Sequence, residues 1–424
     1  MNGAADVWFL ETVLFAHPIP SFRIVRNSPK ECRPPAARGQ LGVRAATGSL
    51  KLRVSLFYYR LDPDPHNILL MNTLAVEKRT DAASVENSAD QPSPQPILNA
   101  AFGFAVTRAL STAIELDIFT KIARGLATLD ALSRDTGCST DGLFMLLHAL
   151  TALEFLAENG GQYSLPPVSA AYLTKTSLYY MGDYVSVTTA SAWLAWAHLS
   201  SVVRTGKPYR EVQGEKPDSE FFCDLVPALH VLTAPAARVA AVAFGNRNPG
   251  GPSQVLDVAA GSAVWSLAIA RENPEAKVTV IDLPDVLERI TQKSVEREGD
   301  SDRFTFRPGN LRTMDLGEGL FDLVILGHIC HGEGAERSRS LIQRAHRALR
   351  PGGQILIAEL LPDDDRHGPL LPLVFGLHML VLTNGGGTFT LAEFRNWLSE
   401  AGFDDVRTLA VPAPSPLILA TKRQ

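Results

Sequence analysis

The chain has 424 residues, of which 46% are hydrophobic and 20% are charged, so it can bury a large core and should form two or three domains. Its formal net charge of -5 does not match a nucleic-acid groove, which needs a basic face. Its four cysteines lie far apart and no apolar run is expected to reach membrane-spanning length, so we expect a cytoplasmic protein with no membrane partner.

The first 93 residues show little order in their sequence. Proline and arginine are scattered, apolar periodicity is poor, and residues 85–96 (VENSADQPSPQP) resemble a polar, proline-rich linker. Met71 begins a stretch that is more typical of a protein N-terminus. We interpret residues 1–93 as a disordered extension or a mispredicted start, and expect a chain that begins at Met71 to fold.

Residues 94–180 predict an α-helical winged-helix domain. Helical periodicity over 100–123 is followed by a helix, a turn, a second helix at 140–153 and a hairpin that turns at Asn159-Gly160-Gly161. A DNA-binding winged helix would use the second helix as its reader, but this helix is almost wholly apolar and has no arginine or lysine to contact phosphates. We therefore expect it to pack against a second subunit in a homodimer, with no nucleic-acid partner.

Residues 181–250 are expected to link this domain to the next one. The stretch 179–203 is rich in aromatic and small residues, and 221–244 has the pattern of a pair of apolar helices. Both segments could line a substrate pocket, and both are equally consistent with ordinary core between domains.

Residues 251–424 predict a Rossmann-like, doubly wound α/β domain that opens with a nucleoside-binding pattern. A short apolar strand at 255–258 is followed by a turn of small residues, a helix from Val264, and a second strand that ends at Asp282. In such sheets the acid about twenty residues after the turn accepts hydrogen bonds from the ribose hydroxyls. The alternative is an ordinary strand–helix–strand unit with a close turn.

The turn after the first strand favours S-adenosylmethionine (SAM) over a dinucleotide. Pyrophosphate binding needs the bare backbone of a G-x-G-x-x-G turn, and of that set only Gly261 is present. SAM keeps the adenosine but has no phosphate, so it needs fewer glycines. The rest of the domain continues to alternate, with strands at 304–307, 323–327 and 355–359, helices at 335–349 and 391–401, and an antiparallel pair at 406–411 and 417–421.

Polar residues follow several of these strands at the edge where ligands of such sheets bind. They are Asp257, Asp282, Asn310, His331 and Glu359. His331 is a candidate general base, because imidazole titrates near neutral pH and can take a proton from a phenol. Glu359 could orient or polarise it. The alternative is a structural histidine.

Several segments, in order, resemble the plant and bacterial small-molecule O-methyltransferases, of the caffeate, flavonoid, hydroxyneurosporene and polyketide type. VLDVAAGSAVWSLAIARENPEAKVTVIDLPDV resembles their first SAM motif, and RPGN, HICHGEG, RALRPGGQILIAELLP and TFTLAEFRNWLSEAGF resemble four later motifs. The match covers the chain from about Ile97 onward. It implies a class I methyltransferase domain at 251–424, preceded by a winged-helix domain through which the enzyme forms a homodimer.

The resemblance also implies roles for particular residues. His331 and Glu359 correspond to catalytic positions. The residues that correspond to SAM-binding positions are Asp257, Gly261, Asp282, Leu283, Asn310, Leu311 and Gly327. The sequence departs from the family pattern at four places. Ala259 and Ala260 replace two turn glycines, and Asn310 replaces the acid of the RPGN segment. Gly332-Glu333 replaces the Asp-Trp that follows the histidine, and Thr388 replaces a second acid.

We therefore expect a SAM-dependent methyltransferase that acts on a hydroxyl of a small aromatic or polyketide-like acceptor, with His331 as base and no metal. One alternative is C- or N-methylation on the same fold, with or without a metal held by His331 together with His328 or His378, although the ligand spacing is loose. Another is a non-catalytic SAM- or metabolite-binding module, which the loss of the acid at Thr388 would suit.

Overall fold

The computed structural model describes residues 92–212, 218–247 and 251–423. The prediction for residues 1–93 lies outside this part of the chain, apart from Pro92 and Ser93. From Pro94 onward the chain forms one compact unit.

The N-terminal part of this unit has the predicted winged-helix order. Its elements are α2 (Gln95–Glu115), α3 (Ile118–Ala123), α4 (Leu129–Thr136), α5 (Thr140–Ala152), β1 (Ala157–Asn159), β2 (Gln162–Ser164) and α6 (Pro167–Tyr172). The side chains of Thr128 and Ser139 cap α4 and α5, and Gly137 ends α4 in the left-handed conformation. A separate core centred on Leu132 and Leu147 holds these helices together.

Three helices follow: α7 (Gly182–Ala197), α8 (Leu199–Thr205) and α9 (Ser219–Arg247). The predicted helical pair at 221–244 is wrong, because α9 is a single helix with Pro227 and Pro235 inside it. Proline removes a backbone donor and usually breaks a helix. Here α9 packs along the first helix of the α/β domain through a row of buried alanines, and this burial offsets the lost hydrogen bonds.

Two described helices, α2 and the Ser219–Gly245 part of α9, are long and apolar enough to cross a membrane by length and composition. The expectation that no apolar run reaches this length is therefore wrong. Each helix has packing partners in the fold, since α2 contacts α3, α5 and α7, and α9 contacts α7 and the α/β domain.

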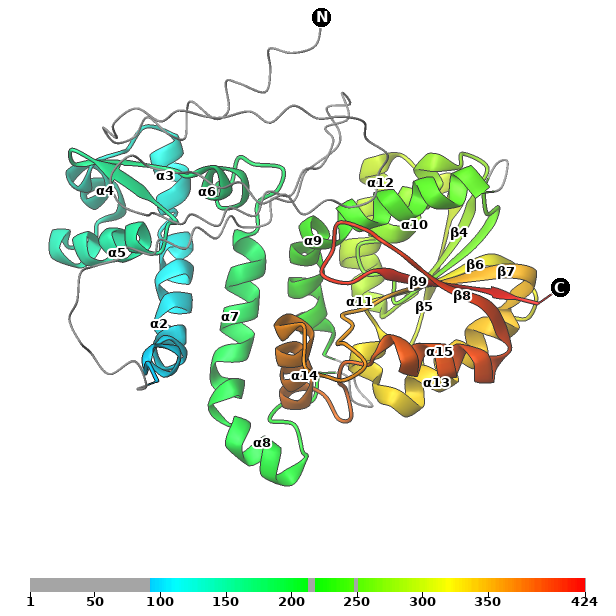
Figure 1. The fold of residues 1–424 in the computed structure, drawn as a ribbon. Coiled ribbons are helices and arrows are strands. Elements are labelled where there is room, and N and C mark those ends of the chain that lie inside the picture. The colour runs from blue at the N-terminus through cyan, green and yellow to red at the C-terminus, as the bar shows by residue number, and fades with distance from the viewer. Residues whose placement is uncertain (1–91, 213–217, 248–250, 424) are drawn as a thin grey trace, which may run out of the picture. The chain divides into compact units, whose positions relative to one another are not determined.

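The α/β domain contains a seven-stranded sheet with the order β5-β4-β3-β6-β7-β9-β8 (Figure 1). The strands are β3 (Gln254–Val258), β4 (Lys277–Asp282), β5 (Phe304–Pro308), β6 (Phe321–Gly327), β7 (Leu349–Ala358), β8 (Phe403–Leu409) and β9 (Leu417–Lys422). The first five are parallel, and β9 is antiparallel to both β7 and β8, as predicted for the final pair. The chain leaves β3 toward β4 and β5 and later returns to β6 on the other side, so the order reverses at β3, where such sheets bind their ligands.

Helices cover both faces of the sheet, and Figure 1 shows α10 on one side and α13 with α15 on the other. The helical elements are α10 (Val264–Glu272), α11 (Pro284–Val286), η1 (Leu287–Thr291), α12 (Gln292–Glu298), η2 (Ser301–Arg303), α13 (Cys330–Ala348), α14 (Leu370–Leu382) and α15 (Leu391–Ala401). The helix predicted from 335 matches the part of α13 that follows a kink at Gly334, and α13 has a further turn before the kink, from Cys330. The predicted starts of two strands were wrong: β7 begins at Leu349 rather than 355, and β8 begins at Phe403 rather than 406. No pattern in the sequence predicted α14.

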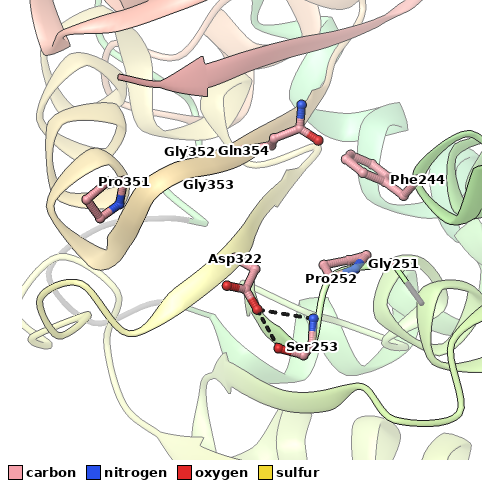
Figure 2. A pocket seen from close by; sticks show the side chains of 9 residues that line it. All are labelled: Phe244, Gly251, Pro252, Ser253, Asp322, Pro351, Gly352, Gly353 and Gln354. Carbon is pink, nitrogen blue, oxygen red and sulfur yellow. Dashed lines mark hydrogen bonds between the residues drawn. The ribbon is translucent and has the colours of Figure 1, made fainter. Parts of the chain in front are cut away.

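Figure 2 shows a hollow of about 330 Å³ at the amino ends of β3 and β6, the edge of the sheet opposite to the predicted site. Its one charged side chain, Asp322, accepts hydrogen bonds from the backbone N–H and the hydroxyl of Ser253, at 3.1 and 2.7 Å. Asp322 also accepts from the Gln254 backbone and from Arg350, at 2.8 and 3.0 Å. Because its carboxylate is fully used in joining two strands, we interpret this hollow as structural.

Candidate active site

Asp282 lies at the carboxyl end of β4 with both carboxylate oxygens oriented by the backbone. The N–H groups of Gly261 and Leu283 donate to Oδ2 and Oδ1, each at 2.7 Å. Burial raises the pKa of Asp282 to about 6, although these two hydrogen bonds oppose the rise. Each oxygen keeps a further lone pair, so the carboxylate can still accept hydrogen bonds from two ribose hydroxyls.

The turn between β3 and α10 keeps its tight form although two family glycines are alanines. Ala259, Gly261 and Ala263 all have positive φ angles, of 56°, 55° and 55°. Left-handed alanines cost roughly 1 kcal/mol each, and backbone hydrogen bonds hold the turn against that cost: Ala260 donates to Ile281 at 3.1 Å. At Gly261 a Cβ would lie 3.1 Å from Val226, so this glycine also makes room for α9.

Asp257 lies beneath this turn rather than on the open edge. It is 1% exposed and accepts a hydrogen bond of 2.6 Å from the hydroxyl of Ser266 on α10. Burial raises the pKa of Asp257 to about 7. In this position the carboxyl fixes the start of α10 on β3, and its role as a SAM contact stays a prediction.

Asn310 and Leu311 follow the edge strand β5, and Gly327 is the last residue of the central strand β6. The Asn310 side-chain oxygen accepts from the backbone of Arg312 at 3.0 Å, which orients its amide. Leu311 packs on the core under α13. At Gly327 a Cβ would lie 2.6 Å from Nε1 of Trp265, so the glycine is required by a buried indole.

The Gly332-Glu333 departure from the family pattern has a structural role that the sequence does not reveal. Glu333 is 3% exposed and accepts from Nε and Nη2 of Arg312 at 2.9 and 3.1 Å. Arg337, one turn later on α13, lies 3.3 Å away on the same carboxylate. Glu333 thus ties the start of α13 to the segment after Asn310.

His331 and Glu359 are brought together as predicted. The Nδ1 atom of His331 lies 2.7 Å from Oε2 of Glu359, and the His331 backbone N–H donates to Oε1 at 3.1 Å. Burial alone would raise the pKa of Glu359, but the charge and hydrogen bonds of His331 hold it below its ordinary value. When the ring is neutral with its proton on Nδ1, Nδ1–H donates a hydrogen bond to the ionised carboxylate, and the lone pair of Nε2 is left to take a proton.

A glycine loop closes over the backbone of His331. Gly387 donates to the His331 carbonyl at 2.8 Å. A Cβ on Gly334 would lie 2.2 Å from the Gly385 carbonyl, so the two segments meet backbone to backbone. Thr388, at the place of the family's second acid, donates to the Pro372 carbonyl at 3.1 Å and so anchors α14 to this loop.

His328, His331 and Glu359 each offer one ligand atom, and these atoms lie within 4.8 Å of one another. Burial lowers the pKa of His328, so its ring is neutral and able to ligate. The Glu359 carboxylate already accepts hydrogen bonds from the backbone and the ring of His331, however, so a metal would compete with them. This geometry favours a hydrogen-bonded pair of His331 and Glu359 over a metal centre.

Comparison with known proteins shows to which family this chain belongs. Two family models match the chain: the O-methyltransferase dimerisation domain over residues 98–175 and the O-methyltransferase domain over 246–404. The tetracenomycin polyketide synthesis 8-O-methyl transferase of Streptomyces glaucescens is 31% identical over 334 residues, which cover 78% of this chain and 97% of that enzyme. The chain belongs to the SAM-dependent small-molecule O-methyltransferase family. It is a SAM-dependent methyltransferase.

Solved O-methyltransferases share the fold. A putative O-methyltransferase from Nostoc punctiforme matches with a TM-score of 0.72 and 26% identity, covering 78% of this chain and 100% of that one. Human N-acetylserotonin methyltransferase, solved in complex with SAM, matches with a TM-score of 0.68 and 26% identity, covering 80% and 100%. The predicted order of a dimerisation domain and a Rossmann-like class I domain is thus confirmed, as is SAM as the cofactor.

Proposed function

We propose that this O-methyltransferase acts on a hydroxyl of a small aromatic or polyketide-like molecule, with His331 as general base and Glu359 as its orienting partner. The observation that carries the proposal is the 2.7 Å contact between His331 Nδ1 and the buried Glu359 carboxylate. That contact leaves Nε2 as the proton acceptor. The names of similar enzymes, which include a 3-hydroxy-5-methyl-1-naphthoate 3-O-methyltransferase, support an aromatic acceptor.

The residues of the chain supply binding, alignment and proton transfer. SAM supplies the methyl group as an electrophile on a sulfonium centre. We propose that Asp282 holds the ribose, with further contacts from Gly261, Leu283, Asn310 and Leu311, and from Asp257 and Gly327 below them. Nε2 of His331 would take the hydroxyl proton as the acceptor oxygen bonds to the methyl carbon and the sulfur–methyl bond breaks, with S-adenosylhomocysteine as the leaving group. Holding the two reactants in line removes much of the entropic barrier.

We also propose that the enzyme is a cytoplasmic homodimer with no nucleic-acid or membrane partner. The dimerisation-domain match supports the homodimer. So do the exposed apolar side chains of α2 and α5, where Ile97, Phe102, Phe104 and Met145 are 73, 63, 61 and 66% exposed in the single chain.

The test is turnover of methyl-labelled SAM with a panel of phenols, naphthols and hydroxyquinones. Label should transfer to acceptor oxygen and give an aryl methyl ether. Transfer to carbon or nitrogen would favour the alternative methylation chemistries. Tight SAM binding with no transfer to any acceptor would favour a non-catalytic module.

A further inference from the structure

Helix α14 brings two side chains to the neighbourhood of the base. It lies between α7 and the start of α13 (Figure 1), and it contacts both helices. Phe375 and His378 are one turn apart on α14 and face the same way. The Phe375 ring stands nearly perpendicular to the His331 ring, with centroids 5.0 Å apart, and lies 5.9 Å from the ring of His378.

The tautomer of His378 is fixed from the other side by α7. Nε1 of Trp196 donates to Nδ1 of His378 at 3.0 Å, and the two rings are nearly parallel, at 21°. An indole N–H can only donate, so Nδ1 must be the unprotonated nitrogen and the proton must lie on Nε2. Burial, together with the charge of His331, lowers the pKa of His378 to about 4, so the ring stays neutral.

The Nε2–H of His378 has no partner within the described part of the chain, where its one hydrogen bond is the one to Trp196. Nε2 is not one of the fully buried side-chain atoms without a partner in the described residues, so it keeps some accessible surface. His378 therefore presents a fixed N–H donor beside an aromatic ring that borders the base. The proposed reaction uses neither feature.

We propose that His378 is a positioning residue that donates from Nε2 to a carbonyl oxygen of the acceptor, next to the hydroxyl that is methylated, while Trp196 fixes the tautomer. This inference rests on the proposed function and narrows its substrate class to hydroxyaryl ketones. The edge of Phe375 gives the flat ring an apolar surface. A neutral donor suits a neutral carbonyl, because neither group needs a buried counter-charge.

The test compares two acceptors that differ in one oxygen, 8-hydroxy-1-tetralone and 5,6,7,8-tetrahydro-1-naphthol. Binding of each to the enzyme loaded with S-adenosylhomocysteine is measured by calorimetry, for wild type, His378→Phe, His378→Gln and Trp196→Phe. The wild type should bind the ketone more tightly. His378→Phe keeps the ring and loses the donor, so it should weaken ketone binding on the order of ten- to a hundredfold and leave the naphthol nearly unchanged.

His378→Gln places an amide N–H near the position of Nε2, so it should recover part of the ketone affinity. Trp196→Phe keeps an aromatic ring beside His378 but removes the N–H that fixes its tautomer, so its loss should be smaller than that of His378→Phe and again confined to the ketone. Equal losses for both acceptors, or a wild type that does not prefer the ketone, would overturn the proposal. Because binding is measured without turnover, this outcome is separate from a failure of His331 as base, which changes kcat.

Discussion

The backbone N–H and the side chain of His331 both bond to the same carboxylate, that of Glu359, at 3.1 and 2.7 Å. The two contacts fix the ring's position and its tautomer together. Glu359 comes directly after β7, and β7 pairs in parallel with β6, the strand that precedes His331. The sheet therefore sets the distance between the base and its orienting acid.

We predict that Glu359→Gln lowers kcat by about tenfold or more and leaves SAM affinity within about twofold. The amide keeps the size of the side chain but removes the charge that stabilises the protonated base, and general-base catalysis contributes about 10²–10⁴ in rate. Steady-state kinetics with isothermal titration of SAM checks both parts. Glu336→Gln, an exposed site on α13, is the matched control and should behave like wild type. An unchanged kcat in a folded Glu359→Gln variant would exclude this role.

Asp282→Ala should weaken SAM binding by about 1.5–3 kcal/mol, because it removes a charged acceptor for two hydroxyls. The same change leaves the backbone N–H groups of Gly261 and Leu283 without their acceptor. Calorimetric titration of SAM measures the loss, and Asp302→Ala, at an exposed position, serves as control. Wild-type affinity in a folded Asp282→Ala protein would show that the ribose lies elsewhere.

Gly334→Ala should damage the site while Gly387→Ala should not. A Cβ at Gly334 would meet the Gly385 carbonyl at 2.2 Å, and its φ of 81° disfavours any side chain, whereas a Cβ at Gly387 meets nothing within 4 Å. Displacing the loop that donates to the His331 carbonyl should lower kcat, with a loss of roughly 1–3 kcal/mol in the free energy of unfolding. Denaturant unfolding of the two variants measures the free energy of unfolding, and steady-state kinetics measures kcat. Equal stability and kcat in the Gly334→Ala and Gly387→Ala variants would contradict the prediction and mean that the loop moves aside at little cost.

The pH dependence of stability should depend in part on Asp257. Burial raises its pKa to about 7, against roughly 3.9 in an unfolded chain, so the folded state binds the proton more tightly. The stability that this carboxyl contributes is complete below about pH 4 and is lost as pH rises through 7. Asp257→Asn keeps an acceptor for Ser266 but does not titrate. Its unfolding free energy should fall less than that of wild type between pH 4 and 8, as measured by urea unfolding. Parallel curves would contradict the raised pKa.

The sequence predicted the parts of this molecule whose signals are local. The strand, turn, helix and strand over 254–282 follow from apolar runs and small residues that lie next to one another, and the tight turn survives Ala259 and Ala260 because the fold supplies the hydrogen bonds. Helix α14 was missed because LLPLVFGLHMLVL is apolar all round and has no amphipathic period. The contact between Trp196 and His378 joins residues 182 positions apart, so only the packed structure reveals it.

The last prediction concerns His331, because it separates general-base O-methylation from the metal-assisted alternative. A phenol with a pKa of about 10 is scarcely ionised at neutral pH, so its attack gains from a base that accepts the proton. His331→Ala should lower kcat on a phenol by about 10²–10⁴ and leave SAM affinity nearly unchanged. The loss should shrink for acceptors of lower pKa, such as nitrophenols, which are already partly ionised at neutral pH. Treatment of the wild type with a chelator should leave kcat unchanged, since the proposed proton transfer needs only His331 and Glu359. Near-normal kcat in His331→Ala would make the histidine structural. Inactivation by the chelator, restored by added zinc or magnesium, would instead favour a metal at His328, His331 and Glu359.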